Sequence, residues 1–367
     1  MREKGAGSML TDIHVEGFRS VRALRLRLAP VTVVVGANGT GKTNLYQALR
    51  LLQAAASGTL ARTVADAGGM PSILWAGARK KGAVRLRVGA TIGDFQYEMA
   101  LGLPTPAETV FPTDPLVKEE RIRLDGGALL DRARRSAKLR DADGRPVTHA
   151  FDLWASESAL ARLSEPQRYP ALFAVREALL AWRFYHQFRT DEGSPIRQAQ
   201  VPVSTPALAH DGRDLAAALR TIQDIGDGNA LAAAVDRIMP GARLDVVDGT
   251  MVRLETPGLL RPLDARELSD GTLRFLCLAA ALLSPRPPPL LALNEPETSL
   301  HESVLPALAD LVAAVPRETQ IWVTTHARSL ADALASRGAK VVELEKVEGE
   351  TRVVGAGLVE PDEEEER

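Results

Sequence analysis

The chain has little of several features that would fix a class of protein at once. Among its 367 residues there is one cysteine, so a disulfide framework within the chain and a zinc cluster of several cysteines are both excluded. The net charge is -2, so any contact with nucleic acid must come from a local basic patch. No stretch approaches 18 uninterrupted apolar residues, and the N-terminus lacks the apolar segment of a signal peptide. We therefore expect a cytoplasmic protein without a membrane span.

The composition is that of an ordinary soluble globular protein. Apolar residues make up 45% of the chain and charged residues 25%, which allows a sizeable core. The length is enough for one large domain or two modest ones. The cysteine, Cys277, lies in the apolar run LRFLCLAAALL and is expected to be a small buried hydrophobic residue.

The order of patterns along the chain predicts an α/β fold. Segments that read as buried strands and helices alternate in the first and last thirds, which predicts one mostly parallel central sheet. Residues 11–30 and the segments AVRLRVGAT and FQYEMALGL alternate apolar and polar residues, as strands of an N-terminal antiparallel sheet do. The stretch between these thirds is harder to assign. We expect one α/β domain built from residues 1–103 and 236–358, an inserted helical or mixed lobe at 104–235, and a disordered acidic tail at 359–367.

The segment VVVGANGTGKTNLYQAL, from Val33 to Leu49, matches G-x-x-x-x-G-K-[ST] at every fixed position. Glycines let successive backbone N–H groups curl around phosphate oxygens, and the helix that begins near Lys42 adds its positive end. Lys42 is expected to reach the β- and γ-phosphates, and the Thr43 hydroxyl to ligate Mg²⁺. A glycine-rich turn without a ligand is the alternative. The predicted nucleotide-binding residues of this loop are Gly36, Asn38, Gly39, Thr40, Gly41, Lys42, Thr43 and Asn44.

Two further strands of the last third end in polar residues. LLALNEPE reads as a buried strand followed by carboxylates, and in P-loop NTPases such a strand manages Mg²⁺ and the attacking water. Glu295 is the candidate to polarise that water. IWVTTH ends in His326, 31 residues after Glu295, and this histidine could contact the γ-phosphate. A structural role for His326 is the alternative.

LSDGT, from Leu268 to Thr272, precedes a predicted helix. A serine, a glycine and a helix N-terminus can together bind a second anion. The alternative is a plain helix cap, with Ser269 or Asp270 as the capping residue.

The order of these motifs resembles the head of ATP-binding cassette ATPases, and more narrowly the RecF/SMC-like and OLD-type P-loop NTPases. In this resemblance LSDGT stands at the signature motif, NEPETSLH at Walker B and the D-loop, and His326 at the switch histidine. VEGFRSV resembles the F-R-S strand of these proteins, which implies that Arg19 lies close to bound nucleotide. HDGRDLAAAL resembles a motif of the stand-alone predicted ATPases. The resemblance covers roughly residues 9–60 and 205–345.

The resemblance implies ATP and Mg²⁺ as cofactors and an ATP-dependent homodimer. The P-loop of one subunit and Ser269 and Gly271 of the other would bind the same nucleotide, and a two-fold pair would close two such sites. DNA and a partner nuclease or effector protein are the candidate partners, in DNA repair or phage defence. An ATP-gated interaction module with little or no hydrolysis is the main alternative. A transporter nucleotide-binding subunit is less well supported, because no membrane partner is visible.

The sequence departs from the family pattern at Walker B and at the D-loop. Asn294 stands where Walker B normally has Asp; it keeps one acceptor oxygen for Mg²⁺ but loses the charge. We expect slow or Mg²⁺-sensitive hydrolysis rather than none. His301 stands where many D-loops end in Asp. No Q-loop glutamine is evident, and Gln96 reads better as a strand residue.

Other departures narrow the function. The 41 residues after His326 are too few for the TOPRIM nuclease domain of OLD-type proteins, and no heptad run predicts a coiled coil. The segment RARRSAKLR, residues 132–140, carries five basic residues and is either a solvated face or a DNA contact.

Overall fold

The computed structural model describes residues 9–78, 85–104, 110–133, 136–150, 154–163 and 165–355. The chain divides into two compact units, and each is described by itself. The first comprises Met1–Ala29, Gly36–Trp182 and Val342–Arg367, and the second comprises Pro30–Val35 and Arg183–Val341. The acidic tail expected at 359–367 lies outside the described residues. Among the residues described, no helix is both long and apolar enough to cross a membrane.

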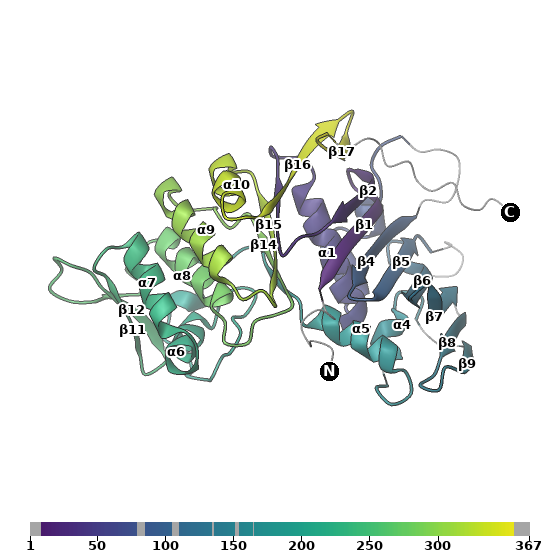
Figure 1. Ribbon diagram of the computed structural model, residues 1–367, viewed down its shortest axis with the longest axis horizontal. Coiled ribbons are helices and arrows are strands. Elements are labelled where there is room, and N and C mark those ends of the chain that lie inside the picture. Colours follow the sequence, from purple (N-terminus) through teal and green to yellow (C-terminus); the bar gives the residue numbers. More distant parts are fainter. Residues whose placement is uncertain are drawn as a thin grey trace. The chain divides into compact units, whose positions relative to one another are not determined.

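The first unit is built on an eight-stranded antiparallel sheet with strand order β2-β1-β4-β5-β6-β7-β8-β9 (Figure 1). Its alternating sequences bury one face, as expected for a sheet covered on one side. The strands are β1 (Leu10–Phe18), β2 (Val21–Arg27), β4 (Leu86–Ile92), β5 (Phe95–Gly102), β6 (Leu116–Leu124), β7 (Gly127–Ala133), β8 (Ser136–Arg140) and β9 (Pro146–Ala150). The antiparallel strands predicted from AVRLRVGAT and FQYEMALGL are confirmed as β4 and β5, which pair as a hairpin. Strands β6 to β9 belong to the stretch 104–235 and extend this same sheet.

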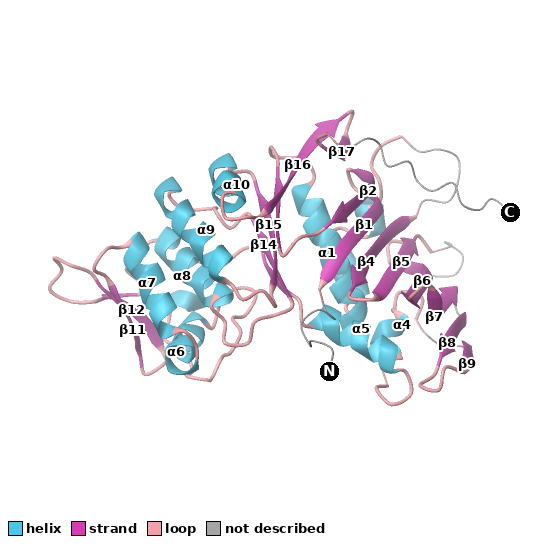
Figure 2. Ribbon diagram, viewed as in Figure 1, coloured by secondary structure: helices cyan, strands magenta, loops and turns pink. Residues whose placement is uncertain are grey.

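Helix α1 (Lys42–Ser57) is the central helix of the first unit and contacts β1 and β4 (Figure 2). Leu45, Leu49 and Leu52 are fully buried on its apolar side, as their spacing predicted. It ends at Gly58, whose left-handed backbone lets its N–H bond the last turn. The other helices of this unit are α2 (Leu60–Asp66), α3 (Met70–Ile73), α4 (Ala159–Arg162) and α5 (Pro170–Leu180).

A buried ion pair holds β6 and β7 to the start of α4. Glu120 and Arg132 are 0% and 1% exposed, and the guanidinium lies 3.2 Å from the carboxylate. Glu120 also accepts hydrogen bonds from the hydroxyls of Tyr97 and Ser158 and from the N–H of Ala159. Arg132 belongs to the basic segment RARRSAKLR, so one of its five basic residues serves this interior network and is not available to DNA.

Strands β16 (Lys340–Val347) and β17 (Glu350–Val353) form an antiparallel hairpin late in the chain. Strand β17 lies against β2, which brings the C-terminal part of the sequence next to the N-terminal sheet. Strand β17 also carries Thr351, whose hydroxyl reaches the Thr40 carbonyl.

The second unit contains four parallel strands in the order β10-β14-β15-β3. The sequences of β3 and β14 are mostly apolar, and all residues of β14 and β15 are buried, including the polar ends of β15. The strands are β3 (Val31–Val35), β10 (Arg183–Tyr185), β14 (Leu290–Asn294) and β15 (Gln320–Thr325). Because they are parallel, the residues that follow β10, β14 and β15 meet at one edge.

Helices and a small sheet complete the second unit (Figure 2). The helices are α6 (Leu215–Ile225), α7 (Gly228–Ile238), α8 (Asp270–Leu282), α9 (Leu305–Ala314) and α10 (Arg328–Ala335), with 3-10 turns η3 (Pro195–Arg197) and η4 (Glu302–Val304). The small sheet is antiparallel and contains β11 (Arg243–Val247), β12 (Met251–Glu255) and β13 (Leu263–Asp264).

Helix α8 lies in the core of the second unit. Cys277 on this helix is fully buried, and burial raises the pKa of its thiol, so the prediction of a small buried residue is confirmed. The turn of the segment HDGRDLAAAL packs against it. Gly212 has φ +77°, and a Cβ there would lie 3.1 Å from the Cys277 sulfur. The glycine of that motif is therefore explained by close packing.

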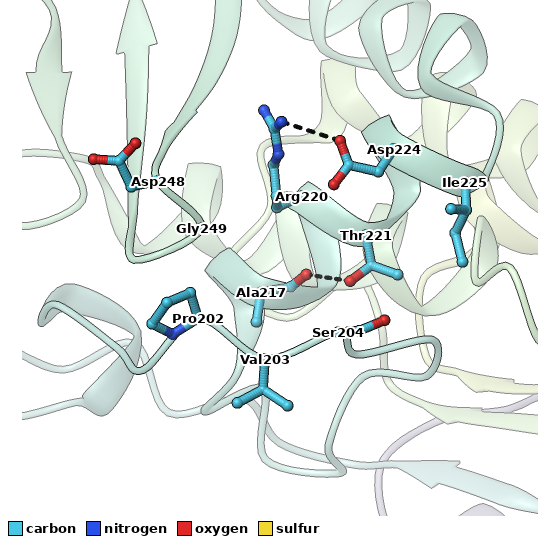
Figure 3. A pocket seen from close by; sticks show the side chains of 10 residues that line it. All are labelled: Pro202, Val203, Ser204, Ala217, Arg220, Thr221, Asp224, Ile225, Asp248 and Gly249. Atoms are coloured by element: carbon cyan, nitrogen blue, oxygen red, sulfur yellow. Dashed lines mark hydrogen bonds and ion pairs between the residues drawn. The ribbon is translucent and has the colours of Figure 1, made fainter.

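An open cavity of about 500 Å³ lies beside α6 and the β11–β12 turn (Figure 3). Arg220 and Asp224 form an ion pair of 3.1 Å on its rim, and the Thr221 hydroxyl donates to the Ala217 carbonyl. Its lining includes none of the residues expected to bind nucleotide.

Candidate nucleotide-binding site

The phosphate loop, residues 36–43, is a tight turn that leads into α1. Gly39 and Gly41 have φ values of +82° and +104°, which side chains rarely adopt. A Cβ on Gly41 would lie 2.1 Å from the Thr351 hydroxyl, whereas a Cβ on Gly39 would meet no heavy atom within 4 Å. The loop is therefore packed closely at Gly41 and open at Gly39.

Lys42 is 3% exposed and folds back over this loop. Its Nζ donates to the carbonyls of Gly36 and Ala37, at 2.8 and 3.0 Å. The hydroxyl of Thr40 also donates to the Ala37 carbonyl, at 2.9 Å. The ammonium group is thus held on the loop, where the sequence predicts phosphate, and Thr43 follows it in the first turn of α1.

Side chains from distant parts of the sequence form a hydrogen-bonded chain that holds the phosphate loop. The Thr351 hydroxyl, on β17, donates to the Thr40 carbonyl at 2.8 Å. Ser20, between β1 and β2, lies 2.8 Å from the Thr351 hydroxyl and accepts a hydrogen bond of 2.8 Å from Asn44. Since the Thr351 proton is used on Thr40, the Ser20 hydroxyl is the donor to Thr351. Sequence reasoning missed Ser20 and Thr351, and it assigned Asn44 to the nucleotide, whereas its amide nitrogen here bonds Ser20.

Arg19 has a left-handed backbone, with φ +48°. Its guanidinium donates to the Ala67 carbonyl at 3.4 Å and lies 5.6 Å from the Phe18 ring centroid. The N–H of Arg19 donates to the Ile73 carbonyl. These contacts give the residue a role in joining the first hairpin to the segment after α1, and its closeness to nucleotide stays a prediction.

In the second unit, Asn294 ends β14 and is 2% exposed. Its Oδ1 accepts a hydrogen bond of 2.7 Å from the Thr324 hydroxyl. Its amide nitrogen lies 2.6 Å from Nδ1 of His186, the residue that follows β10. One lone pair of Oδ1 is left for a metal ion, so the predicted role of Asn294 as a Mg²⁺ ligand requires this oxygen to serve two partners. His186 was not anticipated, because β10 is only three residues long.

Glu297 fixes His326 at the end of β15. Its Oε1 accepts from the Thr325 hydroxyl at 2.6 Å and from the His326 N–H at 3.0 Å, and it lies 3.1 Å from His326 Nδ1. The other oxygen, Oε2, is buried and has no hydrogen-bond partner among the residues that the structure describes. The Glu297 side chain is 6% exposed, so it orients the histidine from the interior.

Glu295 is the accessible carboxylate at this edge. Its side chain is 31% exposed and lies 3.9 Å from His326 Nδ1. Its backbone is left-handed, with φ +49°, and is fixed by an N–H bond to the Thr324 carbonyl. The carbonyl of Glu295 accepts from Arg274 on α8 at 3.1 Å, and burial lowers the pKa of this arginine. Such backbone strain is often stored at functional sites.

The signature loop, residues 265–272, leads into α8. Ser269 is the N-cap, and its hydroxyl accepts from the Thr272 N–H at 3.1 Å. A Cβ on Gly271 would lie 2.8 Å from the Ser299 carbonyl, so glycine is needed for the close approach of the segment after β14. Ser269 is exposed at the start of the helix, where N–H groups lack intrahelical acceptors.

Two departures noted in the sequence have local explanations. His301 caps η4, since its Nδ1 accepts from the Ser303 N–H at 3.2 Å. Gln96 is an exposed residue of β5, in register with Thr91 on β4.

The loop fits the phosphates of a nucleotide. Its glycines provide a tight backbone turn with an open side, its lysine is fixed on the turn, and α1 begins directly after it. Together with the parallel strands, these features define a P-loop ATPase, and they support ATP binding.

The comparisons agree with this class. The chain matches the family described as "AAA domain, putative AbiEii toxin, Type IV TA system" over residues 31–332. It therefore belongs to this AAA domain family. No curated protein matches the chain.

Solved structures of SMC heads share the fold. The SMC head bound to the C-winged helix domain of ScpA is 17% identical, with a TM-score of 0.53, covering 94% of this chain and 97% of that one. The SMC head with an extended coiled coil bound to the C-terminal domain of ScpA, from Pyrococcus furiosus, is 15% identical, with a TM-score of 0.51 and coverage of 94% and 96%.

Proposed function

We propose that this protein binds ATP with Mg²⁺, hydrolyses it slowly, and associates in pairs around the nucleotide. The observation that carries the proposal is the phosphate loop, in which Lys42 is fixed on the carbonyls of Gly36 and Ala37 next to the N-terminus of α1. A buried cation and a helix N-terminus on the same turn favour a ligand with several negative charges.

Each residue has a defined part in this proposal. Lys42 binds the β- and γ-phosphates, and the Thr43 hydroxyl and Asn294 Oδ1 are the oxygens for Mg²⁺. The metal ion would neutralise charge that develops on the phosphates. Glu295 accepts the proton of the attacking water, because it is the exposed carboxylate. His326, oriented by Glu297, donates a hydrogen bond to the γ-phosphate.

Pairing supplies the rest of the site in this proposal. Ser269 and the N-terminus of α8 on a second copy bind the γ-phosphate, so that ATP links two chains and hydrolysis releases them. The biological setting is DNA repair or defence against phage, with DNA or a partner nuclease or effector protein. The family description, which names a toxin and a type IV system, supports the defence role. SMC heads crystallised with ScpA support a protein partner.

The second candidate is an ATP-gated interaction module with little or no hydrolysis. It is favoured by Asn294, whose side chain has no charge and is bonded to Thr324 and His186. Without a carboxylate here, Mg²⁺ is held less tightly and turnover falls.

Phosphate release and mass photometry, each with and without ATP and Mg²⁺, test the proposal. Lys42→Ala is expected to abolish ATP binding under either function. Glu295→Gln is expected to retain ATP and to prolong the life of the ATP-bound pair, if the wild-type protein hydrolyses ATP. A pair lifetime that Glu295→Gln leaves unchanged, with no phosphate released by wild type, would favour the second candidate. A protein that stays monomeric with ATP would refute pairing.

A further inference from the structure

Arg197, at the end of η3, lies almost buried against the signature loop. Its side chain is 10% exposed. It donates hydrogen bonds to three carbonyls of this loop, those of Ala265 at 3.1 Å, Arg266 at 3.0 Å and Leu268 at 2.8 Å. All three carbonyls face one terminal nitrogen, Nη1, whose two hydrogens are shared among them.

The other two nitrogens of the same guanidinium each make a further hydrogen bond. Its second terminal nitrogen lies 2.7 Å from the Asp270 carboxylate, in the first turn of α8. Its Nε donates to the Thr190 carbonyl at 2.8 Å, which ties the loop to the segment that follows β10. Arg197 thus bridges the residues on both sides of Ser269.

These bonds determine which way the loop presents its donors. In a trans peptide the C=O and the following N–H point in opposite directions. Because the Leu268 carbonyl points at Arg197, the N–H of Ser269 points away from it. The N–H groups of Ala265 and Glu267 are bonded to Val252 and Asp264. The orientation of the peptide before the N-cap is therefore fixed by one side chain.

We propose that Arg197 is the residue that positions the signature loop, so that Ser269 and the first turn of α8 are preorganised for the phosphate of a nucleotide held by a second copy. This inference rests on the proposed pairing around ATP. Preorganised donors bind an anion better because no ordering of the loop is needed when the ligand arrives.

The substitution Arg197→Lys keeps the charge and removes the fork of donors. Arg189→Lys is the matched control, because Arg189 lies in the same segment and its exposed side chain pairs with Asp191 rather than with the signature loop. Thermal unfolding first confirms that both variants are folded. ATP binding is then measured at protein concentrations where the chain is monomeric, and both variants are expected to retain wild-type affinity.

Two readouts then separate this inference from the proposed function. In mass photometry with ATP, in a Glu295→Gln background, Arg197→Lys is expected to weaken pairing by about tenfold or more, because several charge-assisted hydrogen bonds are lost. Hydrogen exchange without nucleotide is expected to be faster at residues 268–273 in this variant alone. Pairing as tight as in the control overturns the inference.

If the Glu295→Gln protein itself does not pair with ATP, the proposed pairing is wrong. Hydrogen exchange at residues 268–273 then tests the role of Arg197 by itself. Protection at 268–273 that equals the control then refutes the positioning role, whereas selective loss of protection supports it.

Discussion

Asn294→Asp restores the carboxylate that Walker B strands usually carry, and the structure predicts that this restoration has a cost. The Thr324 hydroxyl can still donate to the new side chain. The amide nitrogen, however, becomes an oxygen 2.6 Å from His186 Nδ1, and the side chain is 2% exposed. The substitution therefore buries a negative charge. The hydrogen bond to His186 can form only if the histidine carries a proton on Nδ1. We expect the free energy of unfolding without nucleotide to fall by about 2–4 kcal/mol.

Mg²⁺ and ATP should reverse this loss, because a carboxylate holds the metal ion better than an amide does. We expect the Mg²⁺ concentration for half-maximal phosphate release to fall by roughly tenfold, since one added charge close to the metal ion is worth at least about 1 kcal/mol. Urea unfolding and phosphate release measure the two effects. Asn229→Asp, on the exposed side of α7, is the control for the same chemical change. Wild-type stability together with wild-type Mg²⁺ dependence would refute the reasoning.

Three other predictions concern the first unit. Glu120→Gln leaves a buried guanidinium without its counter-ion and should lower the free energy of unfolding by about 3–5 kcal/mol in urea, and a loss below about 1 kcal/mol would contradict this. Gly41→Ala should weaken ATP binding by about tenfold or more in a titration, because its Cβ would meet Thr351. Gly39→Ala, on the open side of the loop, should weaken ATP binding less. A larger loss of affinity for Gly39→Ala than for Gly41→Ala would contradict this. The hydrogen bond from His14 lowers the pKa of Glu98 below its ordinary 4.5, so this stabilisation is present above that pH and is lost as pH falls through the folded pKa. The difference in unfolding free energy between wild type and His14→Gln should therefore shrink between pH 6 and pH 3.

The sequence was most informative where structure is local. The phosphate loop follows a short apolar strand and opens a helix, and both signals lie within 17 residues of one another, from Val33 to Leu49. Strands β14 and β15 were recognisable because each contains a short apolar run, LLAL in β14 and IWV in β15, that is followed by polar residues. Local patterns of this kind fix an element without knowledge of its neighbours.

The contacts that join distant segments were not predictable. Ser20 and Thr351 meet across 331 positions; Ser20 lies in the segment VEGFRSV, but nothing in that segment indicates a partner so far along the chain. His186 follows a strand of three residues, which is too short to give a periodic signal. Strands β6 to β9 read as an insertion because pairing to β5, rather than their own sequence, makes them part of the first sheet. Arg197 was missed because its partners are backbone carbonyls 68 to 71 positions away, which have no sequence signature.

The hydrogen bond from Thr351 to the phosphate loop has a consequence for biosynthesis. The loop at residues 36–43 emerges from the ribosome early, but the hydroxyl that holds the Thr40 carbonyl is added 311 residues later. A nascent chain therefore carries the complete phosphate motif long before that motif has its final support. Nucleotide that meets the chain before β17 is made would therefore find a loop without this hydrogen bond.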